Sequence, residues 1–185
     1  MIVRLPIGLI RLALVLALSA SDHVFAAPEK WKAEIDQFTG ADAVQPPPAQ
    51  AVLFIGSSSI RKWTSLARDF PDVRVINRGF GGSELSDSVF YADRIAIPYR
   101  PRLIVVYAGD NDLARGKTPG DVHADFRAFC AKIHAALPET RILFVAIKPS
   151  PAREKLKEKI IAANALIAAE SCPGRPLPRR SPSWR

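Results

Sequence analysis

Short apolar segments alternate with segments of helical periodicity along most of the chain. The apolar segments are rich in Val, Ile, Leu and Phe and lie near 51–56, 73–77, 102–108 and 141–147. Apolar residues at helical spacing predict helices near 59–68, 84–95, 120–137 and 152–170, and one more around Trp31, Ile35 and Phe38. Strands that are apolar on both faces and alternate with helices are typical of a parallel sheet covered by helices. We therefore expect an α/β domain.

Three turns of this pattern carry the polar residues that indicate chemistry. In open α/β sheets, ligands bind beyond the carboxyl ends of the strands, where the strand order reverses. The turns after the first three strands read GSSS at 56–59, NRGFGGSE at 77–84 and AGDNDLARG at 108–116. If the strand order is 2-1-3, the three turns are neighbours and form one pocket.

The first turn has two interpretations when it is considered alone. Gly56 permits a tight turn, and a serine just after it lies beside the N–H groups that begin the next helix. The serines at 57–59 are therefore either helix caps or a source of a nucleophile. A serine nucleophile needs a base and donors for the oxyanion, and the backbone N–H of Gly82 and the side-chain amide of Asn111 are candidate donors. Agreement among three turns favours the catalytic interpretation.

These blocks resemble the SGNH or GDSL-type esterases and acylhydrolases, in particular a bacterial subgroup whose first block reads like FIGSSSIRKW. The similarity covers about residues 31–172, and KPSPAR at 148–153 also resembles the subgroup. The resemblance implies that Ser58 is the nucleophile, that Ser57 replaces the usual aspartate, and that Gly82 and Asn111 are oxyanion donors. It also implies a three-layer α/β/α flavodoxin-like sandwich and hydrolysis of acyl esters without metal or cofactor.

The family's fourth block, an aspartate-x-x-histidine, is absent from this sequence. We therefore expect the domain, residues 27–172, to lack its last strand and its catalytic dyad, and the chain to be nearly inactive and marginally stable. Of the three histidines, His23 falls in the N-terminal segment, whereas His123 and His134 fall on the helix before the fourth strand. Asp121 and His123 have the wrong spacing for the dyad, and we interpret them as solvated helix residues.

The two ends of the chain differ from the domain between them. Residues 1–26 combine two arginines, the apolar run 12–20 and small residues before Ala27, which predicts a signal peptide cleaved after Ala26 and a periplasmic or secreted protein without a stable membrane anchor. Residues 173–185 form an irregular tail with four prolines and four arginines. Of the formal charge of +8, the body over 27–172 carries only +3, which argues against a nucleic-acid partner.

Two cysteines leave a choice between a bridge and free thiols. Cys130 falls on the apolar face of a predicted helix, which favours a buried free thiol over a bridge to Cys172.

Three functions remain for comparison. The first is an exported serine hydrolase acting on acyl or acetyl esters of small molecules. The second is a non-catalytic module that binds an acyl, acetyl-sugar or carboxylate ligand in the same pocket. The third, a phosphate or flavin binder, is disfavoured because the other two turns offer no aromatic residue to stack on a flavin.

Overall fold

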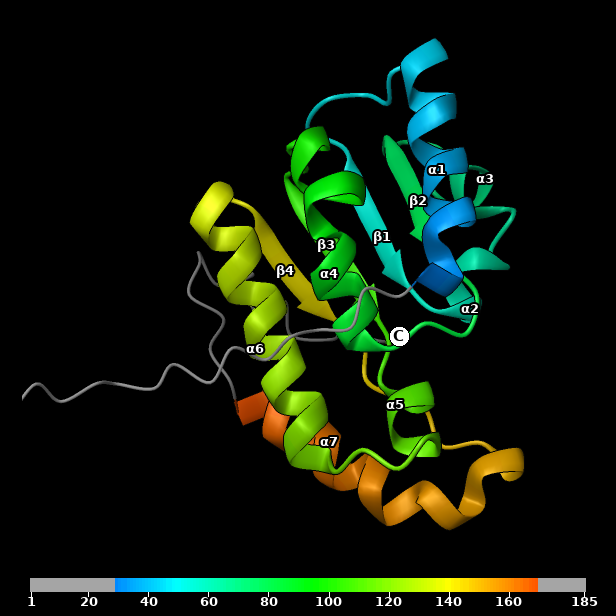
Figure 1. The fold of residues 1–185 in the computed structure, drawn as a ribbon, viewed down its shortest axis with the longest axis vertical. Helices are drawn as coiled ribbons and strands as arrows, with labels where there is room; N and C mark the ends of the chain where they lie inside the picture. Colours follow the sequence, from blue (N-terminus) through cyan, green and yellow to red (C-terminus); the bar gives the residue numbers. More distant parts are fainter. Residues whose placement is uncertain (1–28, 170–185) are drawn as a thin grey trace, which may run out of the picture.

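The sheet contains four parallel strands, seen in the computed structural model of the chain, which describes residues 29–169 (Figure 1). The strands are β1 (Val52–Gly56), β2 (Val75–Gly79), β3 (Leu103–Tyr107) and β4 (Arg141–Phe144), in the order β2-β1-β3-β4. In the register, Gly56 of β1 is aligned with Gly79 of β2 and with Tyr107 of β3. The expected α/β fold with a parallel sheet and 2-1-3 order is confirmed.

Seven α-helices connect and cover these strands in the described part of the chain. They are α1 (Glu29–Val44), α2 (Ser58–Arg61), α3 (Leu66–Asp69), α4 (Leu85–Ile95), α5 (Asp110–Ala114), α6 (Pro119–Ala136) and α7 (Lys157–Ala169). Two 3₁₀ helices, η1 (Ile97–Tyr99) and η2 (Pro151–Leu156), precede β3 and α7.

Two elements differ from the sequence-based expectation because side chains from elsewhere bind their backbone. The helix expected over 59–68 is divided into α2 and α3, and the side-chain amide of Asn77 on β2 donates to the Ile60 carbonyl at the end of α2 (2.7 Å). The strand expected over 141–147 ends at Phe144. Beyond it, the backbone of Ile147 forms two 2.9 Å hydrogen bonds with the side chain of Asn164 on α7.

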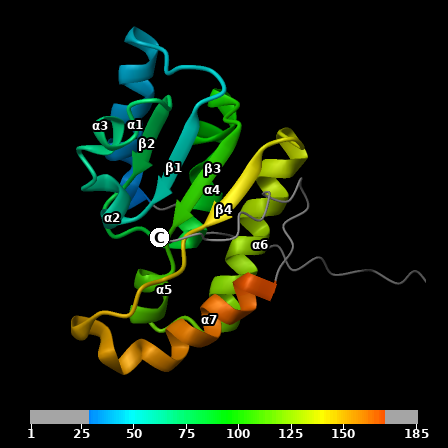
Figure 2. The same ribbon diagram turned by 180° about the vertical axis from the view of Figure 1, so that it is seen from behind.

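The two faces of the sheet carry different layers. One set of alternate strand residues, including Leu53, Ile55 and Ile104, packs against α1, α4 and α6 in the main core. The other set, including Val52 and Phe54, packs with residues of α2 and α3. Figure 1 shows α4 and α6 in front of the sheet, and Figure 2 shows the opposite face.

The second face is only partly covered in residues 29–169. In the rear view of Figure 2, β1, β3 and β4 have no helix over them within residues 29–169. This face forms an open apolar groove of about 630 Å³. Leu143 and Val145 line the groove and keep 38% and 41% of their surface exposed. Because β4 is also the last strand of the described sheet, the apolar face and an unpaired edge lie together.

Cys130 lies on the buried face of α6, but the expectation of a free thiol is wrong. The structure holds Cys130 in a disulfide, and its exposed fraction is 2%. A bridged sulfur and a thiol are both apolar enough to be buried, so the hydrophobic pattern could not separate them. Cys172, the other cysteine of the sequence, lies outside the described residues.

The predicted signal peptide and the predicted tail also lie outside the described residues. Within residues 29–169, each helix is either too short or too polar to cross a bilayer.

Candidate functional site

The three polar turns meet at the carboxyl edge of the sheet, where hydrogen bonds connect them to one another and to the end of β3. Three hydrogen bonds make these connections: Phe80 N–H to the Gly56 carbonyl (2.9 Å), Ser57 N–H to the Tyr107 carbonyl (3.2 Å), and Asn111 Nδ2 to the Ser83 carbonyl (2.9 Å). The second turn is thus bonded to both of the others, and the first turn is also bonded to the end of β3, from which the third turn starts. The structure therefore brings together the three segments that the sequence selected.

Gly56 lets the chain turn sharply between β1 and α2. Its φ is +143°, and a Cβ atom added there would lie 2.0 Å from the carbonyl oxygen of Tyr107. Any side chain would push β1 away from β3, so this close approach requires glycine.

The turn exposes Ser58 in part and buries Ser57 completely. Ser58 is the first residue of α2, whereas Ser57 is its N-cap and has no exposed surface. The Ser57 hydroxyl is buried without a hydrogen-bond partner. Of these two serines, only Ser58 can therefore be reached by a ligand in this conformation.

Gly82 lies in the second turn with a φ of +74°, which an L side chain rarely adopts. Its carbonyl accepts a hydrogen bond from the guanidinium of Arg115 (2.9 Å). Within residues 29–169, its N–H forms no backbone hydrogen bond of its own. The loop is thus fixed through the carbonyl, and the N–H remains available to a ligand.

Asn111 lies in the first turn of α5, a helix that the sequence analysis read as a turn. Its side-chain nitrogen donates to Ser83, and its side-chain oxygen accepts a hydrogen bond from the guanidinium of Arg153 (2.9 Å). Arg153 also forms an ion pair with Asp110 (2.8 Å between Nη1 and Oδ2). The amide is therefore held at both ends by different elements.

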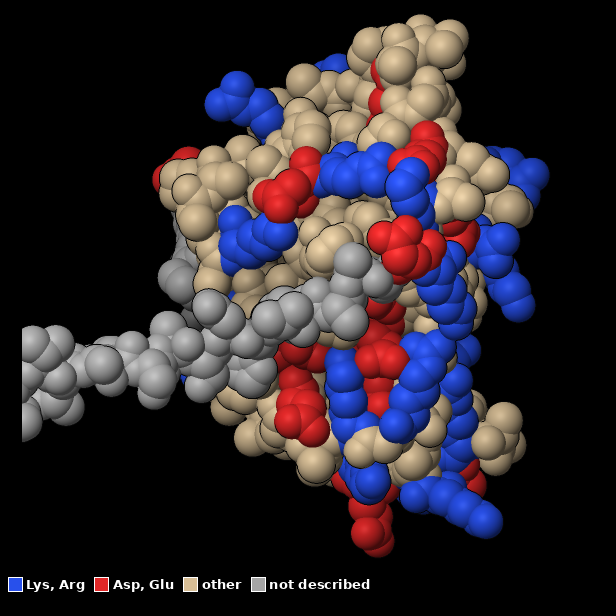
Figure 3. All heavy atoms as spheres, in the orientation of Figure 1, with Lys and Arg blue, Asp and Glu red and all other residues tan. Residues whose placement is uncertain are grey.

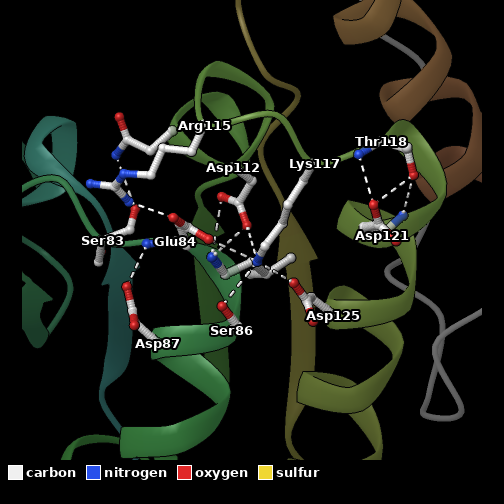
Figure 4. Close-up of polar contacts among 12 residues, drawn as sticks. Ser83, Glu84, Ser86, Asp87, Asp112, Arg115, Lys117, Thr118, Asp121 and Asp125 are labelled. Carbon is white, nitrogen blue, oxygen red and sulfur yellow. Dashed lines mark hydrogen bonds and ion pairs between the residues drawn. The ribbon is translucent and has the colours of Figure 1, made fainter. Parts of the chain in front are cut away.

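A charged cluster that was not predicted from the sequence holds the second and third turns together (Figure 4). At its centre, Lys117 contacts Glu84 (2.9 Å), Asp112 (3.1 Å) and Asp125 (2.8 Å). Asp112 has no exposed surface, and its carboxylate also accepts the Leu85 N–H at the start of α4. In the sequence, the only indication of this cluster is the close spacing of two acidic residues, Asp110 and Asp112, in the third turn.

Burial and charge have opposite effects on the acids and the base of this cluster. Burial raises the pKa of Asp112 above its ordinary value, although Lys117 opposes the shift. Burial alone would lower the pKa of Lys117, but Asp125, Asp112 and Glu84 outweigh it and hold that pKa well above its ordinary value. Lys117 is therefore charged at neutral pH.

A model of the GDSL-like lipase/acylhydrolase family matches residues 42–173, which include all three turns. The chain belongs to this family. Comparison with curated proteins gave no match.

Solved structures related to this GDSL-like chain share its fold. A GDSL-like lipase from Bacteroides thetaiotaomicron superposes with a TM-score of 0.63 at 22% identity, covering 74% of this chain and 72% of that one. A psychrotrophic esterase from Pseudoalteromonas, inhibited by monoethylphosphonate in its crystal, gives 0.53 at 19% identity, with 65% and 72% covered. An acetyl-xylooligosaccharide esterase from Geobacillus gives 0.52 at 13% identity, with 65% and 71% covered.

Both histidines of the described residues lie on α6 of this GDSL-like domain. The Nε2 of His134 lies 2.9 Å from the Thr140 carbonyl, just before β4, so His134 is at the amino edge of the sheet, opposite the site. Asp121 caps α6 through reciprocal hydrogen bonds with Thr118 and is exposed, as expected for a solvated helix residue. His123 follows in the same helix and is half-buried, so it is less solvated than expected.

The surface charge of the GDSL-like domain is mixed on the side that carries α4 and α6. Figure 3 shows Lys and Arg side chains beside Asp and Glu side chains there, and the ion pair between Lys132 and Asp93 is one example.

Proposed function

We propose that the chain is a serine ester hydrolase that acts on acyl or acetyl esters of small molecules, with Ser58 as its nucleophile. The observation that carries this proposal is the set of three hydrogen bonds that join the turn of Gly82 to the turns of Ser58 and Asn111, and the turn of Ser58 to the end of β3. The burial of Ser57 beside a partly exposed Ser58 supports the choice of serine.

The proposed reaction uses each turn once. The Ser58 oxygen attacks the ester carbonyl carbon, and the negative oxygen of the tetrahedral intermediate accepts hydrogen bonds from the backbone N–H groups of Ser58 and Gly82 and from Asn111 Nδ2. Collapse of the intermediate expels the alcohol and leaves an acyl-Ser58 ester. Water then attacks this ester and releases the carboxylic acid and the free serine.

Turnover depends on a base that takes the Ser58 proton and returns it to the departing alcohol. Among residues 29–169 the structure gives no hydrogen-bond acceptor for the Ser58 hydroxyl, and His134 lies at the opposite edge of the sheet. A site without a positioned base retains at most about 10³ to 10⁴ over the uncatalysed rate from its oxyanion donors. We therefore propose that turnover by this chain is low.

A fluorophosphonate probe tests the nucleophile, because it leaves a stable adduct even when turnover is slow. We expect the adduct on the peptide containing Ser58, and its loss in Ser58→Ala. Ser59→Ala is the matched control, since Ser59 is exposed in the same turn and should leave labelling intact. Labelling that survives Ser58→Ala and disappears in Ser57→Ala would refute the assignment.

Export is part of the proposal and is supported by the composition of residues 1–26. We propose a periplasmic or secreted mature chain that begins at Ala27 and keeps no stable membrane anchor. The intact mass of exported protein measures the cleavage directly, and exported material that retains Met1 would contradict it.

A second candidate is a non-catalytic module that binds an acyl, acetyl-sugar or carboxylate ligand. The Arg153 guanidinium next to Asn111 favours it, because a cation at the donor pocket suits a carboxylate. Acetate and acetylated xylose distinguish the candidates. A rise in melting temperature with these ligands, without labelling of Ser58, supports the binding module.

A further inference from the structure

Arg153 contacts the candidate site from the segment that follows β4. It lies in η2, after β4, and its backbone leaves the helical conformation there with φ of −129° and ψ of 29°. Its N–H donates to the Ser150 carbonyl (2.9 Å), which closes a tight turn. This turn directs a side chain that is 30% exposed toward α5.

The guanidinium of Arg153 contacts two consecutive residues of α5, forming an ion pair with the first and a hydrogen bond with the second. Its Nη1 lies 2.8 Å from the carboxylate of Asp110, and its Nη2 donates to the side-chain oxygen of Asn111 (2.9 Å). The ion pair with Asp110 holds the guanidinium beside α5. The hydrogen bond to Asn111 is the directional contact, because Nη1 has no hydrogen-bond partner within residues 29–169.

The two partners of Asn111 allow only one orientation of its amide. A guanidinium can only donate hydrogen bonds, and a backbone carbonyl can only accept them. The amide oxygen must therefore face Arg153, and the amide nitrogen must face the Ser83 carbonyl (2.9 Å). A flipped amide would bring donor against donor at Arg153 and acceptor against acceptor at Ser83.

The orientation decides whether Asn111 can assist the reaction. The amide nitrogen has two hydrogens, and Ser83 uses one of them. The second hydrogen is the one available to a developing oxyanion. In the flipped orientation the oxyanion would meet the amide oxygen, and the interaction would be repulsive.

We propose that Arg153 is a positioning residue that keeps the nitrogen of Asn111 directed at the oxyanion pocket. The inference rests on the proposed function for its consequence, but its structural content is a fixed amide orientation. Asp110 contributes indirectly to the orientation of Asn111, because its ion pair holds the Arg153 guanidinium in place.

The first measurement is independent of activity. In ¹⁵N-labelled protein, the side-chain amide signals of Asn111, assigned by their loss in Asn111→Ala, should exchange slowly with solvent. We expect Arg153→Met to accelerate this exchange by about 10- to 100-fold, as a lost hydrogen bond to a charged group implies. Arg153→Lys, which keeps a cationic donor, should restore part of the protection. Lys155→Met, in the same 3₁₀ segment and exposed, is the matched control and should leave the exchange unchanged.

The second measurement is the rate of fluorophosphonate labelling at Ser58. Arg153→Met should slow labelling by about 10- to 100-fold in the wild-type background and have almost no effect when added to Asn111→Ala. An equal effect in both backgrounds means that Arg153 only supports the loop, and this would overturn the inference.

The outcomes separate the inference from the proposed function. Unchanged amide exchange in Arg153→Met overturns the positioning role, whatever the labelling shows. Accelerated exchange together with no labelling of wild-type Ser58 supports the positioning role and contradicts the proposed nucleophile. Accelerated exchange with slowed labelling supports both.

Discussion

The buried carboxylate of Asp112 lies 3.1 Å from the Nζ of Lys117, five residues further along the chain. The Asp112 carboxylate accepts a hydrogen bond from the backbone N–H at the start of α4, and Lys117 also forms ion pairs with Glu84 and Asp125. This pair therefore links the second and third turns of the candidate site, although neither residue was selected as a site residue from the sequence.

Replacing Lys117 by an uncharged residue should destabilise the fold, because the buried Asp112 carboxylate would lose its cationic partner. We expect Lys117→Met to lower the free energy of unfolding by about 3–5 kcal/mol, because it leaves a buried carboxylate unpaired. Urea denaturation followed by circular dichroism measures the difference. The control is Lys132→Met, which removes a surface pair with Asp93 and should cost less than about 1 kcal/mol. Equal costs for the two variants would contradict a special role for Lys117.

The pH dependence of stability should report Glu84. Burial tends to raise its pKa, but hydrogen bonds from Lys117 and Arg115 outweigh burial and lower the pKa below its ordinary 4.5. A lowered folded pKa means that the stabilisation is present above about pH 4.5 and is lost as the pH falls through the folded value. Glu84→Gln should therefore be less stable than wild type at pH 7, and the difference should shrink below pH 4.5.

Thermal unfolding of both proteins between pH 3 and pH 7 measures this difference. Glu158→Gln, which removes an exposed carboxylate at the start of α7, is the control for a general change in charge. A difference that stays constant with pH would show that Glu84 does not titrate differently in the folded state.

Two glycines should respond to alanine in opposite ways. Gly56→Ala should destabilise the fold by at least about 2 kcal/mol, because the new Cβ would lie 2.0 Å from the Tyr107 carbonyl oxygen at a positive φ. Gly40→Ala should stabilise it by about 0.5–1 kcal/mol, since Gly40 is exposed within α1 and has open space around it. Melting temperatures of the two variants provide the comparison, and a tolerated Gly56→Ala would disprove the close approach of β1 and β3.

The open apolar face should make the protein associate with itself. We expect the double substitution Leu143→Lys and Val145→Lys to reduce aggregation, because both side chains are partly exposed on the groove beside the edge strand. Val44→Lys is the control, since Val44 is 88% exposed at the end of α1, away from this face. Static light scattering against concentration measures the effect, and equal benefit from the control would mean that added charge alone is responsible.

Asn111→Ala should slow the chemistry far more than it weakens the fold. Loss of one oxyanion donor costs on the order of 10² to 10³ in rate. The Asn111 side chain is half-buried and bonded to one carbonyl and one guanidinium, so we expect a stability change of about 1 kcal/mol. The labelling rate of Ser58 and the melting temperature, measured together, separate the two effects. A large fall in melting temperature would indicate a structural role instead.

The sequence predicted the elements that depend on local hydrophobic pattern, but not those that depend on distant partners. Four strands and the convergence of three turns followed from the alternation of apolar and helical segments. The ends of α2 and β4 did not, because Asn77 and Asn164 bind backbone groups of residues far away in the sequence.

The candidate site shows the same division. Ser58, Gly82 and Asn111 could be selected because glycines and polar residues follow apolar strands, and the structure brings their turns together. Lys117 was not selected, and Arg153 was noted only as part of KPSPAR without a role, since a charged residue in a polar loop has no pattern that separates a buried partner from a solvated one. Their roles become visible only when the folded chain surrounds them with carboxylates.

The hydrogen bonds at the carboxyl edge of the sheet also determine how the candidate site tolerates substitution. Two of the three are formed by backbone groups alone, so side chains of the turns can be exchanged while the turns stay in register. The second turn is bonded to both of the others, and the first is bonded to the end of β3 as well, so neither depends on a single contact. The placement of the backbone donors is thereby separated from the identity of the side chains around them, and this scaffold can gain or lose a proton acceptor while the same N–H groups keep their positions.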